Sequence, residues 1–112
     1  MPIKTDDDSS PESIDAEKAM SGVFKLLSHY RRRVALTYLA TQAGTTPVSD
    51  VADQIALLED EHTRDNYERI CMSLVHTHLP VLADAGTITY DYDQEVVELR
   101  DQGTDVLQYL NY

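Results

Sequence analysis

The sequence predicts a mainly helical α+β domain with a small β-hairpin, and three observations lead to this fold class. The 112 residues can form one hydrophobic core but are too few for two. Apolar residues recur at helical spacing in several segments up to residue 85. β-branched and aromatic residues then gather in 87–90 and 96–99, on either side of a polar stretch, which is typical of a hairpin.

The N-terminal segment is acidic, contains Ser and Pro, and has no periodic apolar residues. A segment of this composition buries too little apolar surface to fold, so residues 1–16 are expected to form a disordered tail. The domain is then expected to span residues 17–112 and to begin with a short helix over 17–27.

Two helices are expected next, each preceded by a serine that can act as its N-cap. The first runs from 29 to 42 after Ser28, and the second begins after Ser49. Residues 45–48 between them are expected to form a loop, and the acidic residues 59–62 an exposed connection to the next helix. The apolar residues of the second helix recur at helical spacing and are Val51, Ala52, Ile55 and Leu58.

The longest amphipathic pattern runs from about residue 64 to residue 85, with Thr63 as its expected N-cap. Gly86 ends this helix, the hairpin follows, and Thr104 is the expected cap of a short last helix. A helix that docks, ends on a glycine and continues into an antiparallel pair is typical of winged helix-turn-helix domains, and we expect this fold. The predicted core face of the long helix consists of Tyr67, Ile70, Cys71, Leu74, Val75, His78, Leu79, Val81, Leu82 and Ala85.

The opposite face of the long helix carries hydrogen-bond donors, small hydroxyls and one apolar contact, and no carboxylate occurs from 69 to 83. Such side chains suit base edges and phosphates in a DNA major groove. A solvated face without a function would more often carry Glu and Lys. The sequence therefore predicts that this is a recognition helix, and the predicted DNA-binding residues are Arg69, Met72, Ser73, His76 and Thr77.

The net charge of −11 is unusual for a DNA-binding protein, because 20 carboxylates stand against nine bases. An acidic surface keeps proteins hydrated in a salt-rich, halophilic cytoplasm, and it is also found in interaction proteins that never touch nucleic acid. Both explanations stay open. The acids are unevenly placed, because residues 18–49 contain five bases and no carboxylate.

Three of these five bases are consecutive, at Arg31, Arg32 and Arg33. On a helix they spread over about 200°, so they cannot all reach one DNA backbone. Arg32 is expected to pair with a carboxylate near the core. Arg31 and Arg33 are candidates for DNA phosphate contacts, and a purely structural role is an equally open alternative.

Several classes of protein are not expected. Cys71 is the only cysteine, which excludes an intramolecular disulfide and a cysteine-based zinc site. His76 and His78 are two positions apart, so their side chains diverge on a helix, and we expect neither a metal nor a cofactor. No nucleophile–base pair or Gly-rich phosphate loop indicates an enzyme. No apolar run approaches the ~18 residues of a membrane span, so a soluble cytoplasmic protein is expected.

Two segments carry a family resemblance. The sequence LLSHYRRRVALTYLA at 26–40 resembles the first core helix of arsenic-repressor (ArsR)-like winged-helix regulators. His78-Leu79, Leu82 and Ala85-Gly86 are similar to the signature at the end of their recognition helix. Together with 76–80 and Tyr90-Asp91, this pattern resembles a haloarchaeal winged-helix family of uncharacterised function, over about residues 22–100.

The resemblance implies a homodimeric DNA-binding transcriptional regulator, with Phe24, Leu107 and Leu110 as candidates for the dimer contact. The chain lacks the cysteine pairs with which the ArsR-like proteins sense metals, so metal-dependent regulation is not implied. Its predicted hairpin tip carries Asp91, Asp93 and Glu95 where DNA-gripping wings carry Arg or Lys. The alternative function is therefore a protein-interaction module that uses the acidic wing, binds an unidentified protein partner and does not bind DNA.

Overall fold

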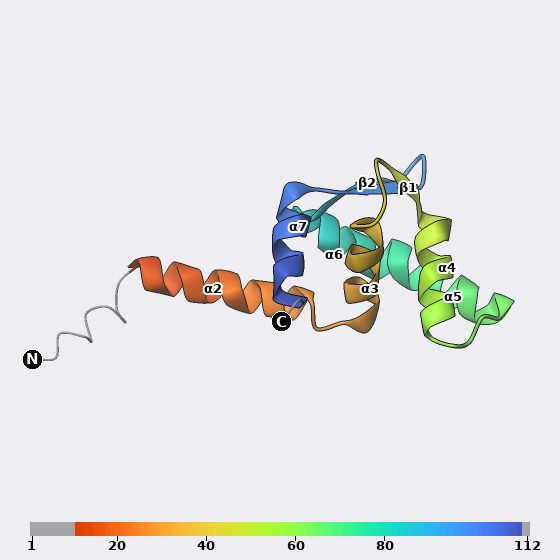
Figure 1. The fold of residues 1–112 in the computed structure, drawn as a ribbon, viewed down its shortest axis with the longest axis horizontal. Helices are drawn as coiled ribbons and strands as arrows, with labels where there is room; N and C mark the ends of the chain where they lie inside the picture. The colour runs from red at the N-terminus through yellow and green to blue at the C-terminus, as the bar shows by residue number, and fades with distance from the viewer. Residues whose placement is uncertain (1–10, 111–112) are drawn as a thin grey trace, which may run out of the picture.

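The computed structural model describes residues 11–110, with side chains from residue 16 onward. Helix α2 (Pro11–Leu26) extends away from the rest of the domain, which packs around a single core (Figure 1). The helix begins at Pro11 rather than at 17, so the prediction of disorder was wrong for 11–16. Proline favours the first helical position because its φ angle is preset there and its missing N–H would have no partner. Residues 1–10 of the predicted tail lie outside the described residues.

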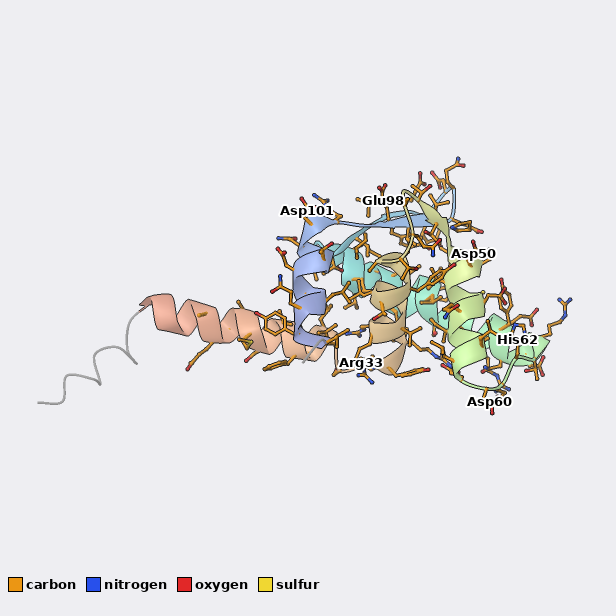
Figure 2. All side chains as sticks on the ribbon, viewed as in Figure 1. Arg33, Asp50, Asp60, His62, Glu98 and Asp101 are labelled. Carbon is orange, nitrogen blue, oxygen red and sulfur yellow. The ribbon has the colours of Figure 1, made fainter. Side chains whose placement is uncertain are left out.

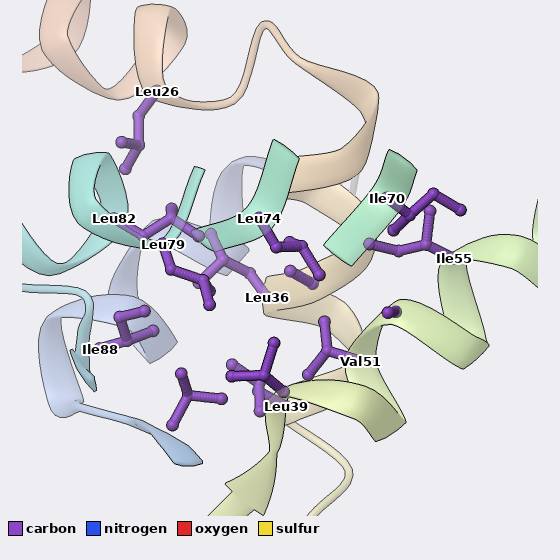
Figure 3. Packing of buried hydrophobic residues seen from close by; sticks show 14 of the residues in the cluster. Leu26, Leu36, Leu39, Val51, Ile55, Ile70, Leu74, Leu79, Leu82 and Ile88 are labelled. Atoms are coloured by element: carbon purple, nitrogen blue, oxygen red, sulfur yellow. The ribbon is translucent and has the colours of Figure 1, made fainter. Parts of the chain in front are cut away.

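Three helical segments form most of the core, as the apolar spacing predicts. They are α3 (Tyr30–Leu39), α4 (Val48–Leu58) and a long segment that consists of α5 (Arg64–Ser73), the π-helical turn η1 (Leu74–His78) and α6 (Leu79–Asp84). Their buried side chains interdigitate in the centre of the domain (Figure 3). Leu36, Val51, Ala52, Ile55, Ile70, Leu74, Leu79 and Leu82 are fully buried.

A three-stranded antiparallel sheet covers one end of these helices (Figure 1). The predicted hairpin is confirmed as β2 (Ile88–Asp91) and β3 (Val96–Leu99). β3 lies in the middle of the sheet and also pairs with β1 (Thr46–Pro47), in the segment that was expected to be a loop. A strand of two residues that contains a proline has no period-two pattern, so the sequence could not indicate it. The chain ends in α7 (Asp101–Leu107) and η2 (Gln108–Leu110).

The structure confirms one of the four predicted helix N-caps. Thr63 is confirmed as the N-cap of α5, because its hydroxyl oxygen accepts a hydrogen bond from the Asn66 backbone N–H at 3.1 Å. Ser28, Ser49 and Thr104 were wrong, since α3, α4 and α7 have no side-chain N-cap. In α4 the backbone N–H of Val48 instead donates to the carbonyl oxygen of Glu95 at 3.0 Å, so the turn between β2 and β3 caps this helix.

The π-helical turn has a local cause in Pro80. Proline has no N–H to donate to the carbonyl of His76, and its ring would clash with that carbonyl in a regular α-helix. The helix widens, and the N–H of Leu79 bonds to Leu74, five residues back. The 100° pattern placed Ala85 in the core, but it is exposed, because it lies at the C-cap after the last residue of α6.

Candidate nucleic-acid interface

The predicted recognition helix corresponds to α5, η1 and α6, and it presents four of the five predicted DNA-binding side chains to the surface. Arg69, Met72, His76 and Thr77 are exposed, and Met72 has 59% of its surface accessible. On the opposite side, Ile70 and Leu74 are fully buried in the core, as are Leu79 and Leu82 of α6. The helix therefore has one docked face and one free face, and the fifth residue, Ser73, lies half-buried between them.

Ser73 and Arg31 belong to a hydrogen-bonded cluster that joins α3 to α5. The guanidinium of Arg31 donates from Nε to Glu59 Oε2 at 2.8 Å and from Nη2 to Oε1 at 3.2 Å. Its Nη1 donates to the hydroxyl of Ser73 at 2.9 Å, and that hydroxyl donates to the Ile70 carbonyl at 2.9 Å. The hydrogen bond from Arg31 outweighs the effect of burial and lowers the pKa of the Glu59 carboxyl.

This cluster gives Arg31 and Ser73 an intramolecular role. A guanidinium held by two oxygens of one carboxylate has its charge neutralised at the site, which leaves little attraction for a DNA phosphate. Asn66 also donates to Glu59, at 3.4 Å, so the connection after α4 is fixed to α5. Glu59 is half-buried, whereas the acidic connection was expected to be exposed throughout.

Arg33 lies on a different side of α3 from Arg31. Its Nη1 donates to the carbonyl oxygen of Leu27 at 2.8 Å, and its side chain borders a groove between α3 and α4. Figure 2 shows Arg33 at the edge of the domain away from Glu98 and Asp101 of the sheet end. The two predicted phosphate contacts are therefore not brought together, as the 200° spread of three consecutive helical residues implies.

Arg32 and His78 form a buried polar pair that connects α3 to η1. The Nε of Arg32 donates to His78 Nδ1 at 3.2 Å, and its Nη1 reaches the carbonyl oxygen of Leu26 at 3.4 Å. The expected carboxylate partner of Arg32 was wrong. Because Nδ1 accepts a hydrogen bond, the neutral His78 ring carries its proton on Nε2. Burial, with the positive charge of Arg32 and the neighbouring His29, lowers the pKa of His78 to about 4.

The neutral His78 makes stability depend on pH in a defined direction. Its folded pKa of about 4 lies below the ordinary 6.5, so the unfolded chain takes up the proton first as the pH falls. The free energy of unfolding should therefore decrease as the pH drops from 6.5 to 4. The contribution of His78 to this decrease is roughly 3 kcal/mol. His78→Asn keeps an acceptor near Nδ1 and removes the titration, so its unfolding free energy should fall less over this window.

Urea unfolding at a series of pH values measures this difference. The matched control is His76→Asn, because His76 is exposed on the same π-helical turn. We expect His76→Asn to follow the wild-type curve. Parallel curves for the wild type and His78→Asn would show that His78 does not carry the effect.

Carboxylates lie closer to the exposed face than the linear sequence suggests. Asp65 and Glu68 border the same shallow depression of about 440 Å³ as Arg69 and Met72. The face is therefore free of acids only in its second half, around His76 and Thr77. Two acids near the first turns would repel a phosphate backbone at this end of the face.

The tip of the β2–β3 hairpin is acidic and exposed, as predicted. Asp91, Asp93 and Glu95 all face solvent, and Tyr92 has 64% of its surface accessible. The ring of Tyr92 lies 5.7 Å from that of Tyr90, and the Asp91 carboxylate accepts a hydrogen bond from the Gln94 N–H at 3.0 Å. This hairpin has no base at its tip with which to bind phosphate.

The predicted dimer residues separate into exposed and packed ones. Phe24 is 59% exposed on α2, and its ring meets that of Tyr109 edge-on at 6.3 Å. Leu107 and Leu110 instead pack half-buried against the chain's own core. Met20, which is 39% exposed on the same helix, was not among the predicted residues and extends the apolar surface of Phe24 and Tyr109.

Neither a metal cluster nor a membrane helix occurs in the part of the chain that the structure describes. Among these residues, no group of three or more His, Cys, Asp or Glu side chains could hold a metal ion. His76 is exposed and His78 buried, as their spacing predicts. Within 11–110, no helix is both long enough and apolar enough to cross a membrane.

Comparison with known proteins gives a family and no further relative. The family described as a domain of unknown function (DUF7344) matches residues 24–98, more than half of the chain. The matched range includes α3, α4, the long helical segment and nearly all of the sheet. No curated protein and no solved structure matches the chain.

Proposed function

We propose that this chain, which belongs to the DUF7344 family, is a DNA-binding transcriptional regulator with a winged helix-turn-helix fold. In this proposal α4 and α5 are the two helices of the helix-turn-helix, and β2 and β3 form the wing. The resemblance of 26–40 and 78–86 to ArsR-like regulators supports the same function.

The observation that carries the proposal is the free face of α5 and η1. Arg69, Met72, His76 and Thr77 form an exposed strip on a helix whose other face packs on the core. The B-DNA major groove accommodates an α-helix, and these side chains offer donors, a hydroxyl and an apolar contact for base edges. The hydrogen bonds of Arg31 to Glu59 and Ser73 link this helix to α3.

Specificity in this proposal depends on short-range contacts. A net charge of −11 disfavours nonspecific attraction to phosphate. We further propose that the protein works in a salt-rich cytoplasm, where the Debye length shrinks to about 3 Å at 1 M salt and long-range repulsion from the acidic surface is screened. Contacts between the helix and base edges are least affected by such screening.

The proposal includes a homodimer that contacts its copy through α2 and the C-terminal residues. Met20, Phe24 and Tyr109 form an exposed apolar surface there, which two copies could cover by symmetry. A dimer would place its recognition helices on half-sites about one helical turn, or ~34 Å, apart.

Selection of genomic fragments in high-potassium buffer, followed by fluorescence anisotropy on the enriched sequence, tests the proposal. Arg69→Ala should weaken binding by about 10-fold or more, as expected for an arginine at a base edge. Arg100→Ala is the matched control, because it removes the same charge from an exposed site at the start of α7. Equal losses in the two variants, or no enriched sequence, would contradict the proposal.

The exposed acidic hairpin favours a second candidate function, contact with a basic protein partner. Tyr92 protrudes at the tip among three carboxylates, and tyrosine is a frequent centre of protein interfaces. In that case Tyr92→Ala would abolish partner binding while Arg69→Ala would leave it intact. If the chain reads DNA, Arg69→Ala should weaken DNA binding and Tyr92→Ala should leave it unchanged.

A further inference from the structure

We propose that the groove between α3 and α4 is a binding site for a small amphipathic carboxylate, a molecule with one apolar ring or short chain and one negative charge. The groove has a volume of about 620 Å³, within the range of sites that hold small molecules. One wall is a stripe of α3 that includes Tyr30, Arg33 and Tyr38, and the other is formed by Gln54 and Leu58 of α4. Leu110 of η2 also lines it.

The apolar part of the groove is exposed without a partner in the described chain. Leu58 has 55% of its surface accessible and Tyr30 has 41%. The helical spacing of Leu58 with Val51 and Ile55 predicted a core position, yet its side chain lies at the rim of the groove. An apolar ring or chain that covered these residues would remove their surface from water, which favours binding.

The charge of the groove selects the polar end of the ligand. Among the described residues, Arg33 is the one basic residue that lines it and no carboxylate does. The bond from Arg33 Nη1 to the Leu27 carbonyl, at 2.8 Å, holds the guanidinium at the groove. The remaining N–H groups of a guanidinium match the two oxygens of a carboxylate.

A small ligand fits this groove better than a second copy of the chain. The groove combines one fixed cation with a short apolar wall, which is the layout of a site that orients one charged group and buries one apolar group. The apolar surface available to a second copy lies instead on α2, around Phe24. The proposed site uses none of the exposed residues of α5, so it does not depend on DNA binding.

Titration of the full-length, ¹⁵N-labelled protein with phenylacetate, followed by NMR, tests the site. Backbone amides of α3 and α4 that border the groove should shift in a saturable way. The neutral isostere 2-phenylethanol and the cationic phenethylamine should bind at least about 10-fold more weakly, because they lose the charge-assisted hydrogen bonds. Binding of all three at similar affinity, or shifts only outside the groove, would overturn the proposal.

Two leucines of α4 provide a matched pair of variants. Leu58→Glu places a carboxylate on the rim of the groove, whereas Leu57→Glu introduces the same charge at a residue that does not line it and is 59% exposed. Phenylacetate affinity should fall about 10-fold or more in Leu58→Glu and change less than about 2-fold in Leu57→Glu. Both substitutions fall on exposed positions, so their spectra should show a folded protein.

An Arg33 variant and a dilution series complete the test. Arg33→Met should lose the preference for phenylacetate over 2-phenylethanol, and Arg33→Lys should keep part of it. Groove amides that shift with protein concentration in the absence of phenylacetate would show that a second copy occupies the groove, and this would overturn the proposal.

Discussion

Replacing Gly103 with alanine is expected to destabilise the fold by about 2–3 kcal/mol, although the same change within a helix normally stabilises it. Gly103 is buried in the first turn of α7, directly against the chain that connects α6 to β2. A Cβ atom at this position would collide with the backbone carbonyl oxygen of Thr87 and would lie 3.2 Å from its carbonyl carbon. The same oxygen accepts a hydrogen bond from the Arg100 N–H at 2.9 Å, so α7 cannot move away without breaking that bond.

Gly22→Ala is the matched control for this prediction. Gly22 lies inside α2, and a Cβ atom there would meet nothing within 4 Å. This variant should be stabilised by up to about 1 kcal/mol, because alanine has the higher helix propensity. Urea unfolding of both variants should therefore give changes of opposite sign. If Gly103→Ala were as stable as the wild type, α7 would not be packed on Thr87 as the structure has it.

Leu74→Ala is expected to lower the free energy of unfolding by about 3 kcal/mol, through lost apolar burial and the cavity left behind. Leu74 is fully buried at the start of η1, where it faces the centre of the core. Met72 lies two positions earlier and is 59% exposed, so Met72→Ala should change the stability by no more than about 0.5 kcal/mol.

Thermal or urea unfolding, measured together with DNA affinity, tests which face of the helix packs on the core and which one binds DNA. Met72→Ala should weaken binding to a selected DNA fragment at nearly unchanged stability, because it removes an apolar contact and no core packing. A large loss of stability in Met72→Ala would contradict the assignment of the free face. A nearly neutral Leu74→Ala would contradict the assignment of the docked one.

Long periodic segments made most of the fold predictable. The helical spacing of Ile70, Leu74 and Leu82 identified the docked face of the long helix, and all three are fully buried. The β-branched residues of 96–99 identified the central strand of the sheet. These patterns are visible because an element that buries one side repeats its apolar residues with its own period.

Features that depend on contacts between distant residues could not be predicted from the sequence. The start of α4 is set by a bond from Val48 to Glu95, and no local pattern reports a partner so far along the chain. Ser49, a good N-cap by type, is therefore one residue inside the helix. The π-helical turn did have a local signal in Pro80, because a proline within a helical pattern removes a hydrogen bond.

The candidate site was predicted only in part, because some of its contacts join residues that are far apart in the sequence. Exposure of Arg69, Met72 and His76 followed from helical geometry alone. The roles of Arg31 and Ser73 did not, because the partners are 42 residues apart and meet only through the fold. Arg31 also binds Glu59, 28 residues away in the sequence, and these contacts within the chain occupy two of the predicted DNA-binding residues.

Methylation interference on a selected DNA fragment tests most directly whether the free face of α5 and η1 reads DNA. Dimethyl sulfate modifies guanine N7 in the major groove and adenine N3 in the minor groove, so one experiment reports on both grooves. We predict that guanine N7 methylation within each half-site blocks binding, that adenine N3 methylation does not, and that Arg69→Ala removes the effect at a guanine. Interference confined to adenine N3, or binding that no major-groove methylation disturbs, would contradict the proposed use of this helix.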